Sequence, residues 1–402
     1  MSTAYTWISK ALGTLHQANW YRSVQAIEGL AGPVVQVDGR AMVNFASNDY
    51  LGLAGDQRLI EQAIAATKAY GTGATGSRLL SGHRDIHREL ERAIAQLKST
   101  EDAVVFSSGY LANIGTIATL TNSRDLILSD EYNHASLKNG ARLSGATVIA
   151  YRHCDSTSLK NYLIAHRADY RRCLIVTDGV FGMDGDVCPL PAILDLADNF
   201  DAMVMIDEAH SAGVLGETGA GCAEHFGCSD RPMVQMGTLS KAFASLGGYV
   251  ASSAELIDFL RNRTPSWIYT TGLSPADAAA ATGAIALLQQ SPDRLTRLHQ
   301  NARYLATGID SLLLQLPQPT ASSLKRLPTD SAIVCLQVKD AATVMQLSGQ
   351  LRQQGVFVSA VRPPTVPISR LRMSVMATHT QTHLDQCVGA IAQALRQLEP
   401  AV

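Results

Sequence analysis

Short, continuously apolar runs alternate with helical stretches through the middle of the chain, and this alternation limits the fold more than any other feature. The runs are AVVFSS, LILSD, TVIAY, LIVTD, MVMIDE and GYVAS. Strands that are apolar on both faces are typical of parallel sheets covered by helices. The helical segment RDIHRELERAIAQL, which precedes the first of these runs, carries a single apolar stripe at Ile86, Leu90, Ile94 and Leu97. The sequence therefore predicts an α/β domain with a mostly parallel sheet.

Two further regions flank this domain. Residues 1–55 contain a helical pattern and a hairpin signal at Asp38-Gly39, which predict an N-terminal arm too small to fold alone. Residues 56–290 form the large domain. The pattern changes near LLQQSPDRL, where a Ser-Pro pair suits a helix start. Residues 291–402, with strands SAIVCLQV and RLRMSVMA between helices, then predict a small α+β domain.

Charge and cysteine content narrow the function. The chain has 33 Lys and Arg against 35 Asp and Glu without a like-charge block, which is atypical of proteins that bind nucleic acid or anionic membranes. Its seven cysteines include no CxxC and no metal-like pairing with histidine, and their odd number suits a reducing compartment. The stretch MSTAYTWISKALGTLHQ lacks a basic region followed by a continuous apolar run, and no apolar run approaches the roughly 20 residues of a membrane span. We expect a cytoplasmic protein without a metal that acts on small molecules.

Asp207 and His210 follow an apolar strand in VMIDEAHSAG, at the edge where open α/β sheets bind their ligands. A buried carboxylate is costly unless it meets a cation. A protonated pyridine ring would be such a cation, and the paired Asp would keep the ring charged so that it can accept electrons. The alternative is that both residues only cap the following turn.

Lys241 lies among small hydroxyl residues in MGTLSKAFASLGGY. A lysine that forms a Schiff base needs a partly desolvated site near another positive group, because both lower its pKa. The neighbouring Thr238 and Ser240 can contact a phosphate. A single lysine is usually solvated surface, but this string is far less common than a single lysine and favours a reactive amine.

Two weaker signals lie nearer the N-terminus. In FSSGYLAN a strand runs into a helix, so the backbone N–H groups near Ser108, Gly109 and Tyr110 can hold a phosphate. In DEYNHASLKNG, His134 follows an apolar strand and can stack on a planar cofactor, although a lone histidine is more often structural.

In chain order, the phosphate cup, the stacking histidine, the Asp-x-x-His pair and the Ser-Lys pair resemble the pyridoxal 5'-phosphate (PLP) enzymes of the aspartate aminotransferase fold type. Within them the chain is most similar to the α-oxoamine synthases, which join an amino acid to an acyl-CoA with loss of carbon dioxide. The resemblance covers nearly the whole chain, through FASNDYLGLA, YGTGATGSRLLSGHRDIHRELE, SSGYLAN, YNHAS, TDGVFGMDGD, IDEAHSAGVLG, GTLSKAFASLGGY and RPPTVPISRLRMSVMATHT. It implies the PLP-dependent transferase fold, a large domain with a mostly parallel sheet plus a small α+β C-terminal domain.

The resemblance implies roles for the residues around the cofactor ring. Lys241 matches the lysine that holds PLP covalently and moves protons at the substrate Cα. Asp207 matches the partner of the pyridine nitrogen, and His210 the partner of the ring hydroxyl. His134 matches the histidine stacked on the ring. Gly182 departs from the family, which usually has Ser in VFSMDGD, so that His210 would hold the ring oxygen without this hydroxyl.

The phosphate is expected to contact both subunits of a homodimer. Thr271 in IYTTGLSP matches a residue that reaches the phosphate from the partner subunit, so the resemblance implies active sites at the subunit interface. The residues expected at the phosphate from the same subunit are Ser108, Gly109, Tyr110 and Thr238.

Arginines are the candidates for binding the substrates. In RLRMSVM a period of two sets Arg370 and Arg372 on one strand face, where a guanidinium can grip a carboxylate in a bidentate fork. Family matching favours Arg372, with Asn48 of SNDYLG nearby. Arg22 matches an arginine implicated in holding the far carboxylate of the acyl chain. Arg78, in the glycine-rich stretch that lines the acyl-CoA entrance in this family, is the candidate for the CoA end.

The branches of the family differ in their substrates. VRPPTVP, residues 361–367, is most similar to the branch that joins L-alanine to pimeloyl-CoA in biotin biosynthesis, with a carrier-protein thioester as an alternative acyl donor. The near alternatives join acetyl-CoA or succinyl-CoA to glycine, or palmitoyl-CoA to serine. The distant alternative is a non-catalytic partner subunit, against which Lys241, Asp207, His210 and His134 together argue.

Overall fold

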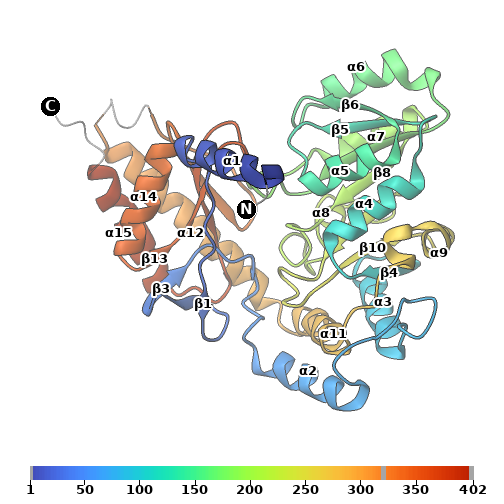
Figure 1. Ribbon diagram of the computed structural model, residues 1–402, viewed down its shortest axis with the longest axis horizontal. Helices are drawn as coiled ribbons and strands as arrows, with labels where there is room; N and C mark the ends of the chain where they lie inside the picture. The colour runs from blue at the N-terminus through green and yellow to red at the C-terminus, as the bar shows by residue number, and fades with distance from the viewer. Residues whose placement is uncertain (1–2, 318–322, 398–402) are drawn as a thin grey trace. The chain divides into compact units, whose positions relative to one another are not determined.

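The computed structural model describes residues 3–317 and 323–397, and the chain divides into two compact units (Figure 1). The large unit comprises residues 48–182 and 186–298. The small unit comprises residues 1–47, 183–185 and 299–402. Among the described residues, no helix combines the length and the apolar character that crossing a membrane requires.

A seven-stranded sheet forms the centre of the large unit, in the order β4-β10-β9-β8-β7-β5-β6. Neighbouring strands are parallel except around β10, which is antiparallel to both β4 and β9. The prediction of a mostly parallel sheet is therefore confirmed. The strands are β4 (Asp102–Phe106), β5 (Leu126–Asp130), β6 (Thr147–Tyr151), β7 (Cys173–Asp178), β8 (Met203–Asp207), β9 (Val234–Thr238) and β10 (Gly248–Ser252).

The core of the large unit follows from the apolar runs. Every residue of β4, β5, β7, β9 and β10 is buried, as expected for strands covered on both faces. Each fully buried aliphatic side chain contributes roughly 1.5–3 kcal/mol to folding. The ends of these strands are therefore held by a rigid framework. One core cluster joins strands and helices through Val104, Ile127, Leu174, Met205, Ile117 and Leu137.

Helices in the large unit begin where the sequence offers caps. The helix α3 (Asp85–Leu97) buries the predicted stripe of Ile86, Leu90, Ile94 and Leu97. The helix α4 (Gly109–Leu120) begins after Ser108, whose Oγ accepts the N–H of Leu111, and α5 (Ala135–Ser144) begins after His134. The other helices of this unit are α2 (Gln57–Tyr70), α6 (Ser156–His166), η2 (Arg167–Asp169), α7 (Leu190–Asn199), α8 (Cys222–His225), α9 (Ala254–Arg263), α10 (Pro265–Ile268) and α11 (Pro275–Gln290).

The small unit contains two four-stranded sheets. The first has the order β1-β2-β3-β13 and consists of β1 (Ile27–Glu28), β2 (Val34–Val37), β3 (Arg40–Asn44) and β13 (Val356–Phe357). The second has the order β11-β12-β15-β14 and consists of β11 (Lys325–Arg326), β12 (Ile333–Gln337), β15 (Arg370–Ser374) and β14 (Ser359–Val361). Its helices are η1 (Thr3–Tyr5), α1 (Thr6–Gln17), α14 (Ala341–Gln353) and α15 (Gln381–Arg396), and α12 (Asp293–Gln315) begins in the large unit.

The N-terminal arm belongs to the small unit. The predicted hairpin is present as β2 and β3, and the positive φ angles of Asp38 (51°) and Gly39 (71°) suit its tight turn. β3 also pairs in parallel with β13, about 310 residues later in the chain. Because this pairing joins distant segments, the arm groups with residues 299–402, and the boundary after the large unit falls at 298/299 where the sequence predicted 290/291.

Candidate active site

The predicted residues Asp207 and Thr238 end adjacent strands of the large sheet, β8 and β9, and Asp178 ends β7. Asp178 is the register partner of Asp207 in the parallel pairing of β7 with β8. The three polar side chains thus share the carboxyl edge of the sheet, where α/β proteins bind their ligands. The N-terminus of α4 carries the predicted residues Ser108, Gly109 and Tyr110, and the N-terminus of α5 carries His134.

Asp207 is a buried carboxylate, 3% exposed, and it accepts hydrogen bonds from neutral donors. Its Oδ2 accepts from Asn113 Nδ2 at 2.6 Å and its Oδ1 from the Ala209 N–H at 2.8 Å. In the described part of the chain, no Lys or Arg forms a salt bridge with it. A buried carboxylate without a cation is costly, so this position suits a ligand that brings a positive charge.

A hydrogen-bonded chain connects Asp207 to His134. Asn113 Nδ2 also donates to Ser136 Oγ at 2.8 Å, and Ser136 Oγ lies 2.7 Å from His134 Nδ1. The Ser136 N–H donates to the same Nδ1 at 3.3 Å, so Nδ1 is the acceptor and the proton of the neutral ring is on Nε2. Burial lowers the pKa of His134 and keeps the ring neutral.

Asp178 fixes the backbone at His134. Its Oδ2 accepts the His134 N–H at 2.7 Å, and burial, together with the charge of Asp207, raises the pKa of Asp178 well above its ordinary value. The two acids at this edge therefore have different surroundings, because Asp178 binds the His134 backbone whereas Asp207 binds Asn113 and the Ala209 N–H.

Lys241, His210 and Tyr50 form a second chain. Lys241 Nζ lies 2.9 Å from His210 Nε2, and His210 Nδ1 lies 2.7 Å from the hydroxyl of Tyr50. The Tyr50 hydroxyl also donates to Asn48 Oδ1 at 3.2 Å. Tyr50 is fully buried and His210 is 8% exposed. The imidazole of His210 therefore lies in a buried position beside the lysine amine, with a contact at each nitrogen. This arrangement brings three predicted residues, Lys241, His210 and Asn48, into one network.

Gly182 leaves room for the His210 ring. A Cβ atom built at residue 182 would overlap Nε2, Cδ2 and Cε1 of His210. The departure of this position from the family pattern therefore has a local reason, because in this chain the imidazole occupies the space beside it.

The predicted phosphate residues surround the N-terminus of α4. A Cβ on Gly109 would lie 3.2 Å from Cβ of Thr238, whose Oγ1 lies 2.7 Å from Ser240 Oγ. No acidic residue lies in the first turn of α4, so its N–H groups and positive dipole end suit an anion. Tyr110 is 44% exposed and its hydroxyl accepts from Asn139 Nδ2 at 2.6 Å. The backbone carbonyl of Thr271 accepts from Ser107 Oγ at 2.9 Å within the same chain.

Arg78 is buried and paired within the large unit. It is 5% exposed, and its guanidinium pairs with the buried Glu91 at 2.6 Å. It also donates to His83 Nδ1 and to the Val105 carbonyl. These contacts with α3 and β4 give Arg78 partners that the glycine-rich stretch does not reveal, and its contact with CoA stays a prediction.

Arg370 and Arg372 of the small unit have different partners. Arg370, 2% exposed, forms an ion pair with Asp184 and donates to the Ile368 carbonyl. Arg372, 4% exposed, donates to Ser374 Oγ at 2.8 Å. Asp184 pairs with Arg370, and the family match that favours Arg372 for a substrate carboxylate stays a prediction.

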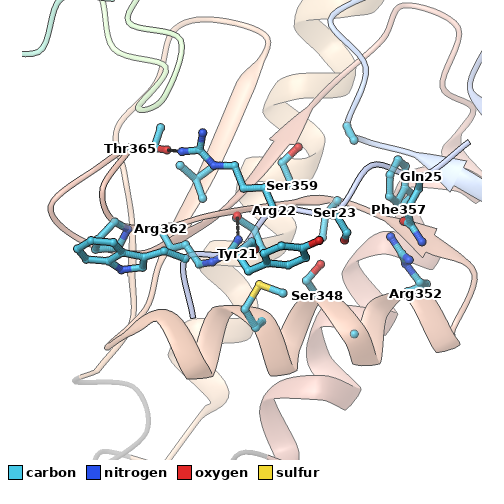
Figure 2. Close-up of a pocket in the computed structure, with 18 of the residues that line it drawn as sticks. Tyr21, Arg22, Ser23, Gln25, Ser348, Arg352, Phe357, Ser359, Arg362 and Thr365 are labelled. Carbon is cyan, nitrogen blue, oxygen red and sulfur yellow. Dashed lines mark hydrogen bonds between the residues drawn. The ribbon is translucent and has the colours of Figure 1, made fainter. Parts of the chain in front are cut away.

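Arg22 lines a cavity of about 650 Å3 in the small unit. Figure 2 shows the cavity between the N-terminal arm, α14 and the segment from β13 to Thr365. Its lining, as far as the described residues go, includes the three arginines Arg22, Arg352 and Arg362 and no Asp or Glu. The cavity therefore favours an anionic group.

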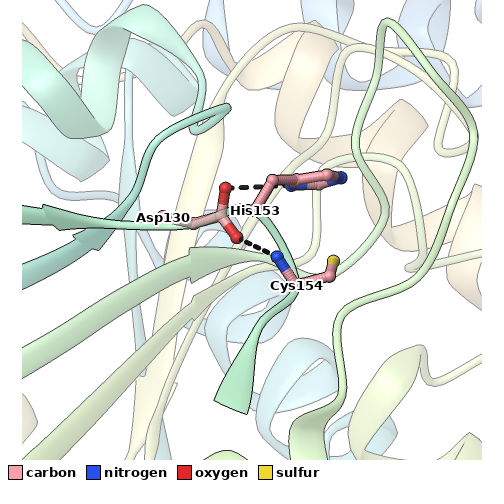
Figure 3. A group of neighbouring side chains, drawn as sticks. All are labelled: Asp130, His153 and Cys154. Carbon is pink, nitrogen blue, oxygen red and sulfur yellow. Dashed lines mark hydrogen bonds and ion pairs between the residues drawn. The ribbon is translucent and has the colours of Figure 1, made fainter. Parts of the chain in front are cut away.

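A polar cluster elsewhere in the large unit resembles a metal site in composition. Asp130, His153 and Cys154 have potential ligand atoms within 4.8 Å of one another (Figure 3). However, both His153 nitrogens are bound to carboxylates, Nδ1 to Asp130 at 3.0 Å and Nε2 to Asp186 at 2.7 Å. These bonds overcome the effect of burial and raise the pKa of His153 to about 12. An imidazolium has no lone pair for a metal, so the cluster is an ion-paired tether.

Sequence reasoning missed two residues of this site. Asn113 lies in SSGYLAN and Tyr50 in FASNDYLGLA, both within the motifs that carried the resemblance. Their contacts with Asp207 and His210 join segments more than 90 residues apart. An amide or phenol inside such a motif was the only available signal.

The model of the family described as aminotransferase class I and II matches residues 40–391 of the chain. The chain belongs to this family. A relative in Nostoc punctiforme named "Putative 8-amino-7-oxononanoate synthase" is 59% identical over 391 residues, 97% of each chain. The chain is thus an α-oxoamine synthase, a PLP-dependent acyltransferase of the aspartate aminotransferase fold type.

Two solved structures agree with this family assignment. A serine palmitoyltransferase from S. paucimobilis with bound PLP has a TM-score of 0.90 at 28% identity, covering 98% of each chain. An 8-amino-7-oxononanoate synthase from Francisella tularensis has a TM-score of 0.75 at 27% identity, covering 89% of this chain and 98% of the other. The fold prediction and the PLP prediction are confirmed.

The large unit of this synthase fits PLP. The buried Asp207, which lacks a cationic partner in the described structure, suits a protonated ring nitrogen, and the start of α4 suits a phosphate. Lys241 offers an amine at the same sheet edge. His134 is desolvated by its neighbours but keeps accessible surface as a residue, which stacking on a planar ligand requires.

Proposed function

We propose that this enzyme condenses L-alanine with a pimeloyl thioester, giving 8-amino-7-oxononanoate, the released thiol and carbon dioxide, as a step of biotin biosynthesis. The donor is pimeloyl-CoA, with a pimeloyl carrier-protein thioester as the alternative. The names of relatives at 59% identity support the family branch.

The cationic cavity is the observation that carries the choice of acyl group. A pimeloyl thioester ends in a carboxylate, whereas acetyl and palmitoyl groups end in a methyl. The described lining residues include three arginines and no acidic residue, which suits the carboxylate of a pimeloyl group. An acetyl or palmitoyl group would desolvate these arginines without offering them a charged partner. We assign the terminal carboxylate to Arg22.

PLP, when bound, supplies an electron sink for the charge that develops at the amino-acid Cα. We assign the other tasks to residues of the chain. Lys241 takes the proton from Cα and later returns one, and its contact with His210 at 2.9 Å holds the amine in place. Asp207 keeps the ring nitrogen protonated, and Asn113 fixes the carboxylate. Arg372 binds the carboxylate of alanine.

The functional unit is proposed to be a homodimer. Thr271 and its neighbour Tyr269, 84% exposed, belong to a surface segment next to Ser107. In the proposed dimer the partner's copy of this segment completes the phosphate site. Size-exclusion chromatography with light scattering tests the assembly, and a monomeric active enzyme would contradict it.

Serine palmitoyltransferase activity is the second candidate, because solved structures with that name reach a TM-score of 0.90. Sequence identity to them is 28–29%, against 59% for relatives named as 8-amino-7-oxononanoate synthases. The higher sequence identity to the 8-amino-7-oxononanoate synthases and the positive charge of the cavity both favour the pimeloyl donor.

A substrate panel tests the proposal. The purified holoenzyme is given L-alanine, glycine or L-serine with pimeloyl-CoA, acetyl-CoA or palmitoyl-CoA, and released thiol and product mass are measured. We expect 8-amino-7-oxononanoate from alanine and pimeloyl-CoA as the fastest reaction. A faster reaction of serine with palmitoyl-CoA, or of glycine with acetyl-CoA, would overturn the assignment.

A further inference from the structure

The branch-specific stretch VRPPTVP contacts the N-terminal arm through Arg362. Arg362 Nε donates to the Asn19 carbonyl at 2.6 Å, and its Nη2 donates to the Tyr21 carbonyl at 2.8 Å. One guanidinium therefore fastens the backbone on both sides of Trp20, immediately before Arg22. A rigid fork of donors is well suited to holding two carbonyls at once.

The same stretch contacts the Arg22 side chain. Arg22 Nη2 donates to Thr365 Oγ1 at 2.8 Å, as the dashed line in Figure 2 shows. Arg362 thus fixes the backbone before Arg22, while Thr365 fixes its guanidinium. A long arginine side chain loses much conformational freedom when it binds an anion, and this prior ordering reduces that cost.

The charges of the two arginines are used differently. Arg362 donates to three backbone carbonyls, those of Asn19, Tyr21 and Ala360, whereas Arg22 donates to one neutral hydroxyl. Among the residues that the structure describes, no carboxylate lines the cavity. Arg22 is therefore the cation better placed to take an incoming anion, and Arg362 acts on it through the arm.

We propose that Arg362 is a positioning residue that makes the enzyme selective for acyl donors with a terminal carboxylate, by holding Arg22 in the cavity. This inference rests on the proposed function. It gives the motif VRPPTVP a physical role in acyl specificity, since its arginine and threonine order the residue that reads the carboxylate.

The test compares pimeloyl-CoA with heptanoyl-CoA, which has the same chain length and no carboxylate. In the holoenzyme, Arg362→Gln is expected to lower kcat/KM for pimeloyl-CoA about 10- to 100-fold, mainly through KM. The kcat/KM for heptanoyl-CoA should change less than about twofold in the same variant. Arg362→Lys keeps the charge but cannot span the carbonyls of Asn19 and Tyr21, so its kcat/KM for pimeloyl-CoA should fall nearly as far as that of Arg362→Gln. Arg396→Gln is the matched control, because that exposed arginine also donates to a backbone carbonyl in the small unit.

A double variant separates positioning from simple loss of charge. If Arg362 acts through Arg22, adding Arg362→Gln to Arg22→Gln should cost little more than Arg22→Gln alone. The inference would be overturned if the losses in kcat/KM of the two single variants multiplied in the double variant. It would also be overturned if Arg362→Gln lowered kcat/KM equally for both acyl donors. A wild-type enzyme that uses both donors equally well, with no effect of Arg22→Gln, would instead refute the proposed function. Melting temperature and the visible absorbance of bound PLP confirm that each variant is folded and loaded.

Discussion

The imidazole of His210 occupies the space in which a Cβ atom at residue 182 would lie, so glycine at this position and the placement of His210 depend on each other. The same ring contacts Lys241 through Nε2 and Tyr50 through Nδ1. A side chain at 182 must therefore displace a ring that is fixed at both nitrogens.

We expect Gly182→Ala to move His210 away from Lys241. The predicted effects are a kcat about tenfold lower and an altered pH dependence of the visible absorbance of the PLP held by Lys241. Gly389→Ala is the control, because a Cβ there meets nothing within 4 Å. An unchanged pH titration in Gly182→Ala would show that the His210 ring does not position the amine.

Asn113→Ala is expected to weaken the Asp207 site. The substitution removes a 2.6 Å donor from a buried carboxylate, which should cost about 1–3 kcal/mol of unfolding free energy. PLP should also dissociate more readily, because Asp207 loses its orientation. Chemical denaturation and fluorescence titration with PLP measure the two effects. Full stability together with full PLP affinity would contradict this role.

Lys241→Ala is expected to abolish turnover and the visible absorbance of covalently held PLP. No other residue provides the amine that we assign to Cα proton transfer. Lys68→Ala, at an exposed position of α2, should leave both unchanged. An unaltered visible spectrum in Lys241→Ala would reassign the attachment residue.

The two neighbouring arginines of β15 should respond differently. Arg372→Ala is expected to raise KM for alanine about 10- to 100-fold while PLP stays bound, since it removes a charged partner of the substrate. Arg370→Ala should instead destabilise the protein by about 3–5 kcal/mol, because it leaves the mostly buried Asp184 without its cation. A normal KM in Arg372→Ala would move the carboxylate to another residue.

Local sequence patterns predicted the strands and helices of this fold. The features that the sequence did not predict depend on contacts between distant segments. The apolar runs and the stripe of α3 each depend on neighbours in sequence, and both appear as expected. Asp207 and His210 were predicted as site residues because strand ends carry ligands in α/β sheets. By contrast, the arm groups with the small unit because β3 pairs with β13, and Arg78 is buried in an ion pair with Glu91. Such pairings leave no periodic signal in either segment.

The His153 tether should make stability depend on pH. Its pKa is about 12 in the folded chain because Asp130 and Asp186 bind both nitrogens, and its ordinary value is 6.5. The folded state therefore keeps a proton that the unfolded state loses above pH 6.5. The stabilisation is complete below pH 6.5 and is lost as the pH rises toward 12.

We therefore expect the gap in unfolding free energy between wild type and His153→Gln to be largest near pH 6. The gap should narrow above pH 7 by up to about 1.4 kcal/mol per pH unit, the slope of one linked proton. Urea unfolding at pH 6, 7.5 and 9 measures it. Replacing the exposed His225 with Gln is the control and should produce no such trend. A gap that stays constant across this range would mean that His153 is not held as the cation between the two carboxylates.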